Sequence, residues 1–138
     1  MGTITRFEDI RAWQTARELT RRIYTVSGRG RFGRDFGLRD QIRRAAVSIM
    51  ANIAEGFESE TSAQFVRFLS YAKASAGEVR AQLYVALDVG YVGEDEFHAL
   101  SDMAEKCSRQ LSRFMAYLKA HPERDRLREP LAEYDVGA

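Results

Sequence analysis

The sequence predicts an all-α fold, an antiparallel up-down-up-down bundle of four helices. Along four segments, apolar residues recur at intervals of three and four, which is the spacing of one helix face. No alternating strand pattern of useful length occurs, and the turns between the last three segments are short, which favours antiparallel neighbours. With 138 residues, of which 45% are apolar and 30% charged, the chain can form one globular domain. We expect the bundle over residues 1–122 and a charged C-terminal tail over residues 123–138.

The first two helices are expected over Phe7–Val26 and Phe36–Glu55. Thr5 and Glu8 fit a capping box at the start of the first helix. Between the two helices, three glycines in residues 27–35 interrupt the apolar pattern and predict a loop.

The third and fourth helices are expected over Thr61–Gly90 and Gly93–Pro122, each with a near-heptad apolar stripe. Gly56 is well placed for a left-handed cap at the end of the second helix. Thr61 and Gln64 fit a second capping box, and three consecutive carboxylates at residues 94–96 suit the positive end of the fourth helix dipole.

The third helix carries more apolar side chains than a single stripe can bury. The candidates for an interface between copies of the chain are Val66, Tyr71, Tyr84, Val85 and Val89. A second apolar face on a long helix is typical of a partner surface, so we expect self-association. The alternative is a wide stripe that a thick core absorbs.

A line of polar side chains runs beside the apolar stripe of the second helix. The candidates for a structural polar seam between helices are Arg44, Ser48, Asn52, Glu55 and Glu78. Partly buried polar groups need partners, so we expect Arg43 or Arg44 to pair with Glu78 of the third helix. The functional alternative is a contact with a ligand or a partner.

Arginine dominates the basic residues, with 18 of 21, and the first 60 residues hold 11 arginines against eight acidic residues. Arginine binds phosphate groups in a bidentate manner. The candidates for a nucleic-acid-binding surface are therefore Arg17, Arg21, Arg22, Arg39 and Arg43. Two alternatives are codon bias in a GC-rich genome and neutralisation by nearby acidic residues such as Glu18 and Asp40.

Enzyme chemistry finds no support in the residue pattern. His98 and His121 lie far apart with no nucleophile at a fixed spacing, and Cys107 falls on an apolar stripe. No Glu-x-x-His pair of the di-iron bundle type occurs. We expect no catalytic residues, no cofactor and no metal site. Since the charged N-terminus is unlike a secretory signal and no apolar run is long enough for a membrane helix, we expect a cytoplasmic protein.

A family resemblance rests on the second helix. Residues 37–49 (GLRDQIRRAAVSI) and 51–56 (ANIAEG) resemble the four helix bundle protein family, also called the 23S rRNA intervening-sequence protein family. Residues 13–16, 65–78 and 90–92 support the resemblance, which covers about residues 7–120. One departure is the loop Gly28–Asp35, where the family leads us to expect a turn that contains a proline.

The resemblance implies a small bacterial bundle that assembles as a homopentamer and has no assigned enzymatic activity. It also implies relatives that contact reverse transcriptase and nucleic acid. We therefore expect a non-catalytic, pentameric scaffold that binds RNA, DNA or a nucleic-acid-handling protein through its arginine-bearing faces. The alternative is a protein-only assembly module with no nucleic-acid role.

Overall fold

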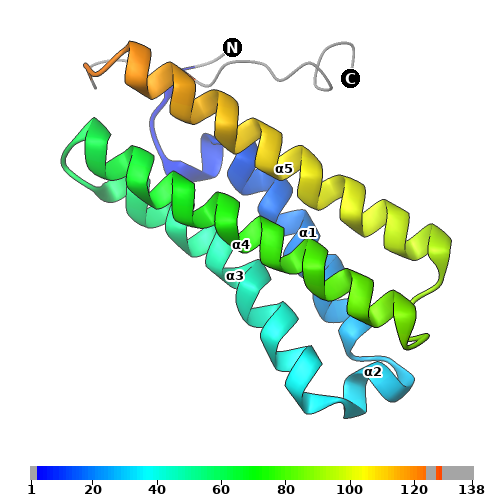
Figure 1. Ribbon diagram of the computed structural model, residues 1–138. Coiled ribbons are helices and arrows are strands. Elements are labelled where there is room, and N and C mark those ends of the chain that lie inside the picture. Colours follow the sequence, from blue (N-terminus) through cyan, green and yellow to red (C-terminus); the bar gives the residue numbers. More distant parts are fainter. Residues whose placement is uncertain (1–2, 124–126, 129–138) are drawn as a thin grey trace.

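The computed structural model describes residues 3–123 and 127–128, the last two by their backbone alone. The chain is an all-α bundle, as the sequence predicts (Figure 1). Its four long helices are α1 (Arg11–Ser27), α3 (Phe36–Glu58), α4 (Ser62–Asp88) and α5 (Glu94–Ala120). Helix α1 contacts α3 and α5, and α4 contacts the same two helices from the other side.

The first helix begins later than the sequence predicts. A 3₁₀ turn, η1 (Phe7–Asp9), is followed by a break at Ile10, whose extended backbone and buried side chain separate the turn from α1. The expected capping box of Thr5 with Glu8 is wrong, because Asp9 takes that role. Its carboxylate accepts hydrogen bonds from the backbone N–H and the hydroxyl of Thr5, both at 3.1 Å. These bonds hold the pKa of the Asp9 carboxyl below its ordinary value.

The expected loop over residues 27–35 contains a short helix, α2 (Gly30–Arg34), and this part of the prediction is wrong. Phe32 explains the helix, because its ring is buried and stacks on Tyr91 with 5.1 Å between ring centroids. Gly33 lets the chain close on itself, since a Cβ there would lie 2.7 Å from the carbonyl oxygen of Gly28. One buried aromatic ring and one close backbone approach therefore order a glycine-rich segment.

Asp35 links this segment to the next helix. Its carboxylate caps α3 by accepting a 3.2 Å hydrogen bond from the backbone N–H of Leu38. It also accepts a 2.8 Å hydrogen bond from the hydroxyl of Tyr91, and this bond raises the pKa of Tyr91. The start of α3 is therefore tied to the turn between α4 and α5.

Helix α3 continues to Glu58, beyond the predicted end at Glu55, and Gly56 is a buried helical residue instead of a cap. The reason is packing between α3 and α4. A Cβ on Gly56 would lie 2.8 Å from Cδ1 of Phe65 and 2.9 Å from Cβ of Phe68. Glycine is needed here because two aromatic residues of α4 lie directly on the helix backbone.

The limits of α4 and α5 agree with the prediction. The Thr61 hydroxyl accepts a hydrogen bond from the backbone N–H of Gln64, and the side-chain oxygen of Gln64 accepts one from the backbone N–H of Thr61. Gly90 takes a positive φ of 79° after the end of α4, a conformation that favours glycine. The carboxylates of residues 94–96 fill the first turn of α5.

All four long helices contribute to one apolar core. The largest side chains that are fully buried in it are Phe32, Phe65, Phe114, Ile10, Leu19, Ile23, Ile42, Ile49, Ile53, Leu69, Leu83 and Leu111. Beside the bundle, strand β1 (Thr3–Ile4) pairs with β2 (Leu127–Arg128) in the antiparallel sense. Of the predicted tail over residues 123–138, residues 124–126 and 129–138 lie outside the described residues. Within the described ranges, no helix combines the length and the apolar character that crossing a membrane requires.

Candidate functional site

Most of the candidate arginines lie where α1 and α3 meet. Thr20 donates a 3.2 Å hydrogen bond to the carbonyl oxygen of Ala46, so the middle of α1 lies against the middle of α3. Near the end of α1, Arg43 of α3 donates to the carbonyl oxygen of Tyr24 at 3.2 Å and to the hydroxyl of Ser27 at 2.8 Å. The spacing of three and four residues along each helix extends this contact into one continuous face. We call it the arginine–aromatic face, and it comprises Trp13, Arg17, Arg21, Tyr24, Phe36, Arg39 and Arg43.

The N-terminal half of this face is hollowed into a groove of about 770 Å³. Trp13 lies in the groove, packed edge-on against Phe7 with 5.2 Å between ring centroids. The guanidinium of Arg17 lies over the Trp13 ring, 5.8 Å from its centroid. The residues that line the groove are Arg6, Glu8, Trp13, Gln14, Arg17, Glu18, Thr20, Arg21 and Met50.

Two further pairs of an arginine with an aromatic ring follow toward α2. The Arg43 guanidinium lies 4.5 Å from the centroid of the Tyr24 ring, and the Arg39 guanidinium lies 4.6 Å from that of Phe36. Tyr24 is 44% exposed and Phe36 is 63% exposed, the highest value among the large apolar side chains of the described chain. Both rings therefore reach solvent while a cation lies against each of them.

Acidic residues offset part of the positive charge. Glu18 accepts hydrogen bonds from Arg21 at 2.5 Å and from Arg22 at 3.0 Å, which lower the pKa of its carboxyl. Arg39 pairs with Asp40 at 2.9 Å. Arg22 is the candidate arginine that falls outside the arginine–aromatic face, because it follows Arg21 by one residue and so lies about 100° further around α1. Helices α1 and α3 thus carry both the arginine–aromatic face and acidic residues that neutralise some of its arginines.

Sequence reasoning missed the aromatic half of this face and the contribution of Arg6. A signal was present for two of the pairs, because Arg17 follows Trp13 by four residues and Arg39 follows Phe36 by three. The third pair joins Tyr24 to Arg43, which are 19 residues apart, so no helical spacing reveals it. The expected contact of Arg43 with Glu78 is wrong, because Arg43 turns toward α1.

Part of the predicted polar seam forms a hydrogen-bonded line between α3 and α4. Ser75 donates to the hydroxyl of Ser48 at 3.0 Å, and Asn52 donates to the carbonyl oxygen of Ser48 at 2.8 Å. Arg44 and Glu78 line the same groove of about 450 Å³, but the described side chains form no ion pair between them. Glu55 is exposed. The seam is therefore made of hydroxyl and amide groups, and its charged members face solvent.

The five apolar interface candidates of α4 fall on two strips of that helix. Tyr71, Val85 and Val89 share the strip of Ser75, which faces α3, and their side chains are 45–50% exposed. Tyr84 lies on the side that faces α5, where its ring is 4.8 Å from that of Phe97.

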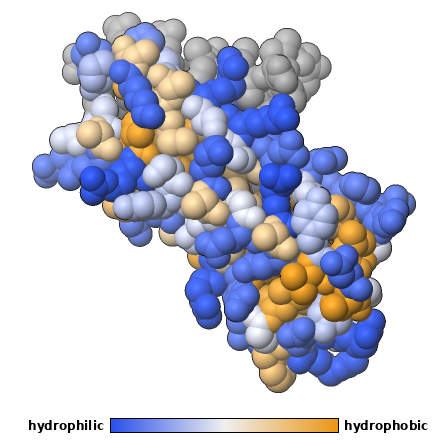
Figure 2. Space-filling view, viewed as in Figure 1, coloured by the Kyte–Doolittle hydropathy of each residue, from blue (hydrophilic) through white to orange (hydrophobic). Residues whose placement is uncertain are grey.

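Val66 is half-buried against the core and lies on the same strip as Tyr84. Between the two strips, α4 exposes the small residues Ser70, Ala74, Gly77 and Ala81. Figure 2 shows apolar surface gathered over the part of α4 nearest α2.

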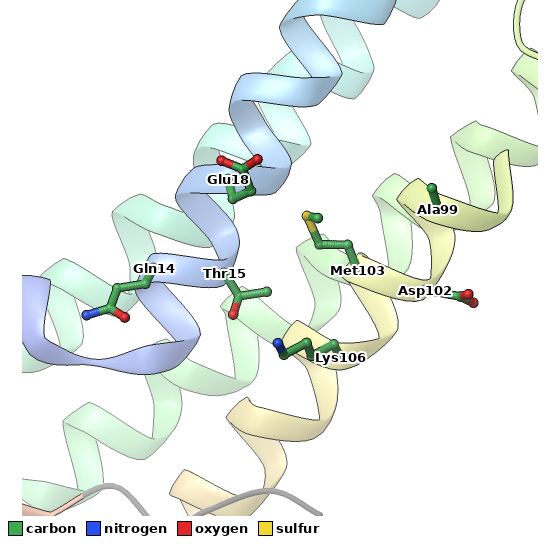
Figure 3. A pocket seen from close by; sticks show the side chains of 7 residues that line it. All are labelled: Gln14, Thr15, Glu18, Ala99, Asp102, Met103 and Lys106. Carbon is green, nitrogen blue, oxygen red and sulfur yellow. The ribbon is translucent and has the colours of Figure 1, made fainter. Parts of the chain in front are cut away.

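A further groove, of about 440 Å³, separates α1 from α5 (Figure 3). In the close-up, Met103 and Lys106 extend from α5 toward α1, whereas Asp102 points away. The groove is lined by Gln14, Thr15, Glu18, Ala99, Asp102, Met103 and Lys106. Because it contains no arginine and no aromatic ring, it has a different character from the arginine–aromatic face on the other side of α1.

Metal-binding side chains do not come together in the described part of the chain. No group of three or more histidine, cysteine, aspartate or glutamate side chains is placed to hold a metal ion there. Cys107 is buried, and its thiol lies 3.5 Å from the carbonyl oxygen of Ala12. His121 packs on Tyr117 at the end of α5, whereas His98 lies in the first turns of that helix.

Comparisons with known proteins agree with this description of the fold. The model of the 23S rRNA-intervening sequence protein family matches residues 8–113. A crystal structure of a protein of unknown function from the S23 ribosomal protein family of Bacteroides thetaiotaomicron superposes with a TM-score of 0.69. The two chains are 21% identical, and the match covers 75% of this chain and 97% of the other. No curated protein matches the chain. The family and the structural neighbour indicate no catalytic activity.

Proposed function

We infer that this chain, which belongs to the 23S rRNA-intervening sequence protein family, is a non-catalytic, homo-oligomeric scaffold that binds RNA or DNA through its arginine–aromatic face. The observation that carries the proposal is the alternation of guanidinium groups and aromatic rings along one side of the bundle, where Tyr24 and Phe36 are exposed and Trp13 is half-buried. Guanidinium groups bind phosphate oxygens, and aromatic rings stack on bases. The acidic residues on the face are fewer than the arginines, so a phosphate backbone meets a net positive surface.

The binding test measures fluorescence anisotropy of labelled RNA and DNA over a range of salt concentrations. We expect affinity to fall steeply with salt, because each phosphate contact releases condensed counterions. Arg17→Ala, Arg21→Ala and Arg43→Ala should each reduce the slope of log affinity against log salt by about 0.7–0.9. Arg113→Ala, at an exposed arginine of α5, is the matched control and should leave the slope unchanged. If no nucleic acid binds at low salt, this function is wrong.

The homo-oligomeric part of the proposal is supported by α4. Four of the seven exposed large apolar side chains of the described chain are Tyr71, Tyr84, Val85 and Val89, all on this helix. The small residues between them allow another helix to approach closely. Burial of apolar area at about 25 cal/mol per Å² favours covering such a surface. The family resemblance supplies the number of copies, which we propose to be five.

Sedimentation or light scattering tests the assembly. We expect a mass close to five times the 15.7 kDa of one chain at micromolar concentration. Val85→Asp should dissociate the assembly while helicity is retained. Val47→Asp introduces the same charge at a similarly exposed valine of α3 and should leave the mass unchanged. A monomer mass for the unmodified protein contradicts the oligomer.

The second candidate function is a protein-only assembly module, and the exposed apolar side chains of α4 favour it. Under this alternative the chain forms an oligomer and binds a protein, including one that handles nucleic acid, without contacting RNA or DNA itself. An assembled protein that retards neither RNA nor DNA at low salt would support this alternative over the scaffold that binds nucleic acid.

A further inference from the structure

We propose that the arginine–aromatic face binds single-stranded nucleic acid in preference to duplex, with Trp13, Tyr24 and Phe36 as stacking platforms for bases. This inference rests on the proposed function and specifies the form of nucleic acid that the face takes. RNA and DNA strands share the chemistry that the face recognises, namely flat bases and a phosphate backbone.

The exposure of the rings is the first argument. Phe36 and Tyr24 keep 63% and 44% of their surface in solvent, although neighbouring core positions bury aromatic rings completely. Exposed aromatic carbon is costly in water and is covered when a flat apolar partner stacks on it. The bases of a duplex are already stacked on one another and hidden from such a ring. An unpaired base is free to stack on it.

The cations on the rings are the second argument. The guanidinium carbons of Arg39 and Arg43 lie over the rings of Phe36 and Tyr24, at 4.6 and 4.5 Å from the ring centroids. Bases stack on guanidinium planes as well as on aromatic rings, and guanidinium groups also bind phosphates. Each pair therefore offers a platform for a base and a contact for the adjoining phosphate. A rigid duplex uses the phosphate contacts alone.

The spacing of the platforms is the third argument. Trp13 and Tyr24 are separated by 11 positions on α1, which is about 16 Å along the helix at 1.5 Å per residue. A stacked strand covers that distance with about five nucleotides at 3.4 Å each. Phe36 continues the row at the start of α3, beyond the contact of Arg43 with Tyr24. A single strand of about ten nucleotides can thus reach all three rings.

The position of Trp13 gives a direct experiment, because it is the only tryptophan of the chain and lies in the groove. The probes are oligothymidylate and oligouridylate of about twelve nucleotides and a DNA hairpin duplex of similar charge. We expect both single strands to quench Trp13 emission and to bind more tightly than the duplex at equal salt. Tyr24→Ala and Phe36→Ala should each weaken single-strand binding by about tenfold. The salt slope should stay unchanged, because phosphate contacts set it.

His121→Ala is the matched control, since His121 carries an exposed ring that stacks on Tyr117 at the end of α5, outside both the arginine–aromatic face and α4. It should leave single-strand affinity unchanged. If the duplex binds as tightly as the single strands and Tyr24→Ala has no effect, the proposed function stands and the single-strand inference is overturned. If none of the probes binds at low salt, both fail. Circular dichroism verifies that the variants fold, which we expect because the altered side chains lie at the surface.

Discussion

The close approach of α3 and α4 at Gly56 makes a specific prediction about stability. Replacing Gly56 with alanine improves helix propensity by about 1 kcal/mol. The added Cβ, however, would lie 2.9 Å from Cβ of Phe68, an atom fixed to the α4 backbone, and 2.8 Å from the ring of Phe65. Relief requires the two helices to separate, and such overpacking costs about 1–3 kcal/mol. We therefore expect Gly56→Ala to lower the free energy of unfolding by about 1 kcal/mol.

Gly37→Ala is the matched control in the same helix. At this exposed position the nearest atom to an added Cβ is Oδ1 of Asp35 at 3.8 Å, an ordinary contact. We expect the control to be neutral or to stabilise by less than about 1 kcal/mol. Urea unfolding monitored by circular dichroism measures both variants, and a change of 1 kcal/mol corresponds to a shift in Tm of about 4 °C. A Gly56→Ala protein at least as stable as the unmodified one would refute the packing argument.

A second substitution separates close packing from helix capping as the reason for this glycine. If Gly56 were a left-handed cap, asparagine would be tolerated better than alanine. Because Gly56 is helical and two phenylalanines lie on it, we expect Gly56→Asn to be less stable than Gly56→Ala. If Gly56→Asn were instead more stable than Gly56→Ala, the result would favour the left-handed cap that the sequence alone predicts.

Three further predictions concern charge, pH and α2. Glu18→Gln removes the ion pairs of Arg21 and Arg22 with Glu18. Affinity for RNA at low salt, measured by fluorescence anisotropy, should therefore rise by about threefold or more. An unchanged affinity would show that these two arginines do not contact RNA. Hydrogen bonds lower the pKa of Asp9 in the folded protein. The contribution of the Asp9 carboxylate to stability is therefore complete above the ordinary carboxyl pKa, and it is lost as pH falls through the lowered pKa of the folded state. As pH falls, the protection of backbone amides in the N-terminal turn, measured by hydrogen exchange relative to the intrinsic rate at each pH, should be lost before protection in the helices is. Phe32→Ala removes the only buried side chain of α2 and should cost about 3 kcal/mol in urea unfolding, and a cost below about 1 kcal/mol would contradict the anchoring role of this ring.

The helices were largely predictable from the sequence because their signals are local. The stripes of α4 and α5, the capping box of Thr61 and Gln64, and the turn at Gly90 depend on residues that are near neighbours in the chain. One error is local, because Asp9 takes the role expected of its neighbour Glu8. The other errors arise where a distant residue decides. Phe32 orders α2 by packing on Tyr91, and Gly56 stays helical because α4 lies on it.

The candidate site divides in the same way. The arginines were found by composition, and the pair of Trp13 with Arg17 follows from helical spacing. The contact of Arg43 with Tyr24 depends on how α1 packs against α3, so the sequence could not place the aromatic rings beside the candidate arginines. The two strips of α4 could have been separated from the sequence, because the adjacent residues Tyr84 and Val85 lie about 100° apart around a helix; only the packing shows that the strip of Tyr84 faces α5.

The pairing of β1 with β2 has a practical consequence. It brings the segment before α1 and the segment after α5 to the same pole of the bundle, about one helix length from α2. A molecule coupled to a sensor chip through the segment at β1 would therefore display its α2 pole, with Phe36 and Arg39, to the flowing solution.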